Sequence, residues 1–184
     1  MSEIAERFRR LSDDLLARIE AVPPDRWDNR SPCEDWTARD VVGHLVNTYA
    51  MFLGFIGREL PPSPSAAEDP VAAYGSARDA IQAVLDYPEA AASEYESPMF
   101  GTSRFENSVD GFLCADIVIH SWDLARATGG DERLDPEEVS LLGERMAPMD
   151  EVLRSPNAFG PKLEPPEGAD EQTRFLAFVG RRAW

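Results

Sequence analysis

The chain has 184 residues, of which 43% are hydrophobic and 28% are charged, a composition that fits one folded domain with a real core. Its 34 acidic residues outnumber its 18 basic residues, and the net charge of −16 argues against nucleic acid and anionic membranes as partners. The N-terminal segment has no continuous apolar stretch and no run is long enough to span a membrane, so we expect no signal peptide and a cytoplasmic protein.

Two amphipathic helices are predicted in the first third of the chain. Apolar residues spaced by three and four positions predict a helix over residues 4–22, which Pro23 and Pro24 end. After a loop, Thr37 is a good N-cap residue, and Asp40 three positions later completes a pattern resembling a capping box. The apolar stripe that follows predicts a second helix.

The middle of the chain predicts two more helices. A linker rich in proline and serine, 57–70, precedes a third helix over 71–86. Residues 87–108 have little periodicity and predict an irregular connection, compatible with a short extended pair around Gly101. The fourth helix, 109–129, is apolar nearly all round, which is typical of a central, buried position.

The remaining chain predicts a smaller helical tail. A glycine pair ends the fourth helix, and Asp135 with Pro136 then begins a helix that runs to about Met149. A long loop rich in proline and glycine leads to a short closing helix within 169–184. The prediction is an all-α protein with a four-helix core, and a single domain over 1–184.

The two cysteines, Cys33 and Cys114, are too few for a disulfide framework. Both have apolar neighbours in the sequence, so we expect two reduced, buried thiols. A role as metal ligands is the less favoured alternative.

Both histidines of the chain fall on predicted helices, at positions that face the core. Asp116 and His120 are four residues apart, so their side chains share one face of the fourth helix, and His44 lies on the second helix. Two imidazoles and a carboxylate suit a divalent cation, and three protein ligands leave a position open for water or substrate. The alternative is a pair of hydrogen-bonded core histidines, because spacing alone does not bring His44 to His120.

Three neighbouring residues are open to two interpretations. Asp123, three positions after His120, either orients that imidazole or forms an ion pair at the surface. Trp36 and Trp122 either line the mouth of a pocket or belong to the core.

Three stretches of the sequence resemble a known family. "SPCEDWTARDVVGHLVN" resembles a signature of the DinB-like metalloprotein superfamily, in the branch of the mycothiol-dependent maleylpyruvate isomerases and their actinobacterial relatives. "ADIVIHSWDLARATG" is similar to the second signature of that branch, and "DEQTRFLAFVGRRAW" is similar to its usual ending. These motifs follow one another along the chain in the order and separation of the family, whereas residues 60–110 contain no matching motif.

The resemblance implies an up-down-down-up four-helix bundle that holds one divalent metal, with zinc or nickel favoured. Carried over position by position, the ligands would be His44, Asp116 and His120. The isomerases have glutamate where this chain has the shorter Asp116, so this residue is the least secure of the three.

Two hypotheses about function follow from the resemblance. In the first, the protein is a metal-dependent thiol transferase or isomerase, with mycothiol as the thiol cosubstrate and a small electrophile as the substrate. In the second, it is a non-catalytic bundle that binds a metal or a small ligand. A homodimer is compatible with both hypotheses, because bundles of this kind often pair through a helix face.

Overall fold

The computed structural model describes residues 2–97, 101–154 and 159–184. The chain divides into two compact units, Met1–Asp131 and Glu132–Trp184. The described residues are mostly helical, which confirms the all-α prediction.

No helix in the described ranges combines the length and the hydropathy that a membrane span requires.

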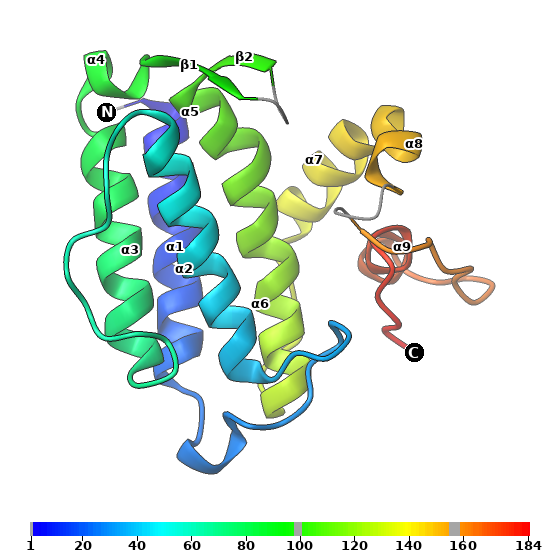
Figure 1. Cartoon of the computed structure of the whole chain (residues 1–184). Coiled ribbons are helices and arrows are strands. Elements are labelled where there is room, and N and C mark those ends of the chain that lie inside the picture. The colour runs from blue at the N-terminus through cyan, green and yellow to red at the C-terminus, as the bar shows by residue number, and fades with distance from the viewer. Residues whose placement is uncertain (1, 98–100, 155–158) are drawn as a thin grey trace. The chain divides into compact units, whose positions relative to one another are not determined.

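Four long helices make up most of the first unit (Figure 1). They are α1 (Glu3–Glu20), α2 (Ala38–Phe55), α3 (Pro70–Leu85) and α6 (Cys114–Thr128). Helices α1 and α2 each pack against both α3 and α6. The colours in Figure 1 show that α1 and α6 run in one direction and that α2 and α3 run in the other. The long connection between α2 and α3 allows these two consecutive helices to lie parallel.

The helix ends follow the capping residues of the sequence. Thr37 and Asp40 form a complete capping box at the start of α2, as predicted. Asp69 caps α3, whose first residue is Pro70. Gly129 ends α6 in the left-handed conformation, with φ at 76°, where a side chain would be strained.

Short elements connect α3 to α6. After α4 (Pro88–Ala91), strands β1 (Glu94–Ser97) and β2 (Gly101–Arg104) pair antiparallel, which confirms the extended pair near Gly101. Helix α5 (Phe105–Ser108) then leads into the fourth long helix.

The fourth helix begins differently from the prediction. Residues Val109–Leu113 form a π-helical turn, and regular α6 starts only at Cys114. Arg7 of α1 forms an ion pair with the carboxylate of Asp110 and also donates to its backbone carbonyl at 2.8 Å. These contacts anchor the wider turn, which hydrophobic periodicity cannot distinguish from an α-helix.

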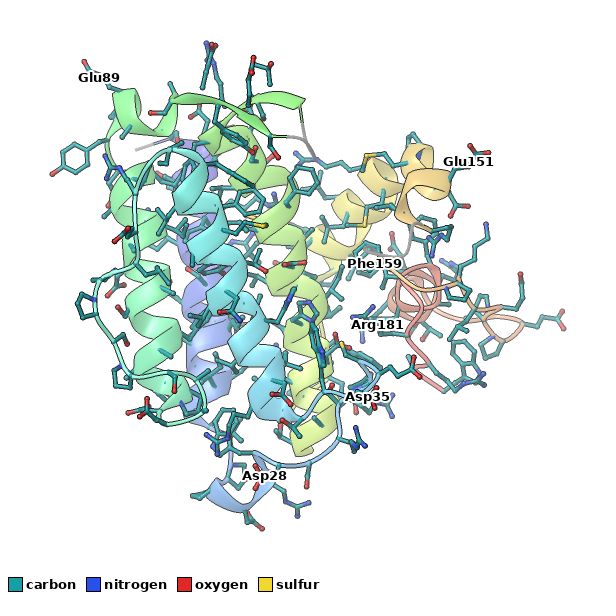
Figure 2. The ribbon with its side chains drawn as sticks, viewed as in Figure 1. Asp28, Asp35, Glu89, Glu151, Phe159 and Arg181 are labelled. Atoms are coloured by element: carbon teal, nitrogen blue, oxygen red, sulfur yellow. The ribbon has the colours of Figure 1, made fainter. Side chains whose placement is uncertain are left out.

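The second unit contains α7 (Pro136–Met146), α8 (Asp150–Leu153) and α9 (Glu171–Phe178). Helix α7 starts after the predicted Asp135 cap, but it ends at Met146 and continues as a 3₁₀ turn over Ala147–Met149. The segment is thus helical to about Met149, as predicted, but its last turn is 3₁₀ rather than α, and Pro148 in that turn lacks the N–H that an α-helix needs. Helices α7 and α9 pack together, and Arg181 lies over the ring of Phe159, 5.9 Å from its centroid (Figure 2).

Candidate metal centre

His44 lies in the second turn of α2, whose first turn is fixed by the Thr37 cap. The Thr37 hydroxyl accepts from the backbone N–H of Asp40 at 3.2 Å and donates to the Asp40 carboxylate at 2.6 Å. The backbone N–H of Thr37 donates to the same carboxylate at 2.9 Å. These bonds hold the pKa of the Asp40 carboxyl below its usual value. The position of His44 is thus set by a well-defined helix start.

Asp116 and His120 project from α6 toward His44. Nε2 of His44 lies 3.4 Å from Oδ2 of Asp116, and the two imidazole ring centroids are 4.9 Å apart. One donor atom from each of the three residues lies within 4.8 Å of the other two. The structure therefore brings together all three residues that the sequence singled out.

The exposure of the three side chains differs. The His120 side chain is only 6% exposed, whereas those of His44 and Asp116 are 33% and 24% exposed. One side of the cluster is thus buried in the core, and the other is accessible to a small molecule. This arrangement suits a site with an open coordination position.

Asp123 makes the contact that an orienting role requires. It is completely buried, and its Oδ2 lies 2.9 Å from Nδ1 of His120. An N–H at Nδ1 that donates to this carboxylate leaves Nε2 of His120 as the ring's lone-pair donor. The donor set of the cluster then consists of two imidazole nitrogens and one carboxylate oxygen, which fits a divalent cation.

Cys33 is a neighbour of the site whose contact with Asp123 the sequence did not predict. It is half-buried rather than buried, and its thiol donates to Oδ2 of Asp123 at 3.3 Å. Cys33, His120 and Asp123 also form a second group whose donor atoms lie within 4.8 Å of one another. Because the loop residue and Asp123 are 90 positions apart, no periodicity in the sequence could show this contact. Cys114 is buried in α6, as expected.

The two tryptophans divide between the two interpretations. The Trp36 ring lies beside both imidazoles, with centroids 4.8 Å from His44 and 6.0 Å from His120. Trp122 is completely buried in the core. Trp36 therefore covers part of the cluster, whereas Trp122 is a packing residue.

A buried tyrosine pair lies in the core near the site. The hydroxyls of Tyr49 and Tyr74 are 3.3 Å apart, and neither residue is exposed. Burial raises the pKa of both phenols, and the nearby Asp116 and Cys114 contribute to the increase at Tyr49. Both phenols stay neutral and serve as hydrogen-bonding groups.

Comparisons with known proteins identify a family to which most of the first unit is similar. The family model described as the mycothiol maleylpyruvate isomerase N-terminal domain matches residues 8–125, which include His44, Asp116 and His120. Two relatives from Mycobacterium tuberculosis are the uncharacterized protein MT0763 of strain CDC 1551 / Oshkosh and the uncharacterized protein Rv0738 of strain ATCC 25618 / H37Rv. Each is 26% identical over 175 residues, which cover 94% of this chain and 94% of the relative. No solved structure matches the chain significantly.

Proposed function

The chain belongs to the mycothiol maleylpyruvate isomerase N-terminal domain family, and from this we propose that it is a divalent-metal enzyme that depends on a small thiol. The thiol, mycothiol in the first instance, would either be transferred to a small electrophile or promote the isomerisation of that electrophile. The observation that carries the proposal is the convergence of His44, Asp116 and His120 from two helices. Zinc and nickel are the metals that we favour, because imidazole and carboxylate ligands suit both.

The helix arrangement supports the family assignment. We propose that α1, α2, α3 and α6 form the up-down-down-up bundle of DinB-like proteins. The directions of the four helices in Figure 1 and the packing of α1 and α2 against both α3 and α6 support this topology. In such a bundle the site lies between the second and fourth helices, α2 and α6.

The chain's own residues prepare the site for a cation. Asp123 keeps the Nδ1 proton on His120, so that Nε2 is available, while Nε2 of His44 already faces the Asp116 carboxylate. When bound there, a divalent cation would supply Lewis acidity that lowers the pKa of a thiol or a water molecule. The exposed side of His44 and Asp116 would admit the thiol and the electrophile, and Trp36 would shield the cluster on one flank.

A non-catalytic role in binding is the second candidate. His44 is close to Asp116 and His120 is close to Asp123, so each imidazole has a carboxylate partner within the chain. Such contacts give each imidazole a polar partner without a cation. These contacts are compatible with a bundle that binds a metal or a small ligand and catalyses no reaction.

Metal analysis tests the proposal directly. Protein purified without a histidine tag should carry one divalent metal per chain, or bind one when it is added. His44→Gln and His120→Gln should each weaken binding by at least about 10-fold, because each removes an imidazole donor. Glu89→Ala, which changes an exposed carboxylate on α4 (Figure 2), serves as the matched control.

The outcomes separate the two candidates. Thiol-dependent turnover of model electrophiles by the metal-loaded protein supports the enzyme. Stoichiometric metal without turnover supports the binding protein. Absence of stoichiometric metal, or unchanged metal affinity in both histidine variants with folding intact, contradicts the proposed site.

A further inference from the structure

Cys33 lies in a loop whose shape is fixed by its own hydrogen bonds. The Ser31 N–H donates to the Trp36 carbonyl at 2.9 Å, and the Trp36 N–H donates to the Cys33 carbonyl at 3.2 Å. Asp35, labelled in Figure 2, takes the left-handed conformation with φ at 64°, which tightens the turn. The loop therefore holds the Cys33 side chain in a defined position.

The Cys33 thiol is the first member of a chain of three polar groups. It donates to Oδ2 of Asp123 at 3.3 Å, and the same oxygen lies 2.9 Å from Nδ1 of His120. Asp123 is completely buried, so its carboxylate depends on donors from the protein. Two donors on one oxygen restrict how the carboxylate can rotate.

We propose that Cys33 is a positioning residue of the candidate metal centre. Its thiol holds Asp123 in the rotamer that accepts the Nδ1 proton of His120, and the imidazole then presents Nε2 toward His44 and Asp116. The inference takes its metal from the proposed function, but the hydrogen bonds that join Cys33, Asp123 and His120 do not need a metal.

Direct ligation by Cys33 is the competing explanation, because Cys33, His120 and Asp123 could themselves surround a cation. In the structure, Nδ1 of His120 is at hydrogen-bond distance from Asp123, and a cation at this place would replace the proton between them. The thiol donates to the same Asp123 oxygen, so the three groups are already joined by hydrogen bonds without a cation. The hydrogen-bonded chain therefore favours the positioning role over ligation.

Cobalt(II) titration of the full-length protein tests this role. Cys33→Ala should weaken cobalt binding by about 10-fold, the lower end of the effect of removing a group that supports a metal ligand. Cys33→Ser keeps a donor and should restore most of the affinity. In an Asp123→Ala background, Cys33→Ala should cause no further loss. Glu34→Ala, in the same loop, serves as the control for loop damage.

Three results would overturn the proposal. These are equal affinities for the alanine and serine variants, a further loss from Cys33→Ala in the Asp123→Ala background, and a thiolate-to-cobalt charge-transfer band in the wild-type protein. The last result would make Cys33 a ligand.

A measurement on metal-free protein separates this inference from the proposed function. The ¹⁵N spectrum of the two histidines, assigned with His44→Gln, should show His120 protonated at Nδ1 in the wild type and in Cys33→Ser. In Cys33→Ala we expect a mixture of tautomers. The same spectrum in all three proteins contradicts the positioning role, and this reading holds even if the wild type binds no cobalt.

Discussion

The side chain of Asp116 is one methylene group shorter than glutamate, and this length decides how far its carboxylate reaches into the site. The resemblance leads us to expect glutamate at this position, yet the shorter carboxylate still reaches to 3.4 Å from Nε2 of His44. The α6 backbone therefore places the shorter carboxylate beside His44. The charge of this carboxylate can be separated from its reach, because an uncharged amide would fill nearly the same space.

Substitutions at Asp116 distinguish these two properties. Asp116→Asn keeps the size but removes the charge, and we expect it to weaken zinc binding by at least about 10-fold. Asp116→Glu keeps the charge and restores the family's residue, so its affinity should stay within about 10-fold of the wild type. Competition calorimetry with a chelator measures both. Asp86, whose carboxylate pairs with Arg9, lies outside the site, so Asp86→Asn controls for the loss of a negative charge elsewhere.

An Asp116→Asn variant with the zinc affinity of the wild type would exclude Asp116 as a ligand.

Among the secondary-structure elements, α2 links the capping box to the site, since His44 follows the Thr37 cap by two turns. Thr37→Ala removes the capping hydroxyl and should lower the free energy of unfolding by about 1 kcal/mol, whereas Thr37→Ser should lower it much less. Urea unfolding at neutral pH measures both variants. Equal stability of Thr37→Ala and the wild type would show that the cap is not formed in solution.

The same cap has a pH dependence with a definite sign. The pKa of Asp40 is lowered in the folded protein, chiefly by hydrogen bonds to Thr37, so ionised Asp40 stabilises the fold above its unfolded pKa. This stabilisation is lost as the pH falls through the lowered pKa, below the ordinary 3.8. In urea unfolding repeated from neutral to acid pH, the difference in unfolding free energy between the wild type and Asp40→Asn should therefore be full at neutral pH and should shrink in acid. A difference that stays constant down to the acid limit would contradict this assignment.

The sequence was a good guide to the helices and a poorer guide to the contacts between distant segments. Thr37, Asp135 and Gly129 marked element ends because capping is local chemistry. The π-helical turn at Val109–Leu113 was missed, since its anchor, Arg7, lies about 100 residues away. His44, Asp116 and His120 could be named from two signatures, but Cys33 could not be placed beside Asp123, because a loop has no periodicity to follow.

For the whole molecule, the matched family domain lies inside the first compact unit, which ends at Asp131. The predicted single domain over 1–184 stays a prediction.

The net charge is summed over all 184 residues: an excess of 16 acidic residues remains after every basic residue is matched with one acidic residue. Repulsion among these carboxylates opposes the compact state.

Salt should therefore stabilise this protein at neutral pH. Raising the NaCl concentration from about 0.01 M to about 0.15 M shortens the Debye length from about 30 Å to about 8 Å and screens the repulsion. Exposed ion pairs such as Arg9 with Asp86 lose strength as well, but each contributes only about 0–1 kcal/mol, so the net charge should dominate. We expect the Tm to rise by about 2–4 °C, the shift that about 1 kcal/mol produces in a chain of this size.

Near the isoelectric point, at about pH 4.4, the net repulsion vanishes and the same salt step should give no rise in Tm. Scanning calorimetry at both pH values decides the matter, and a Tm that falls with salt at pH 7 would mean that specific ion pairs outweigh the net charge.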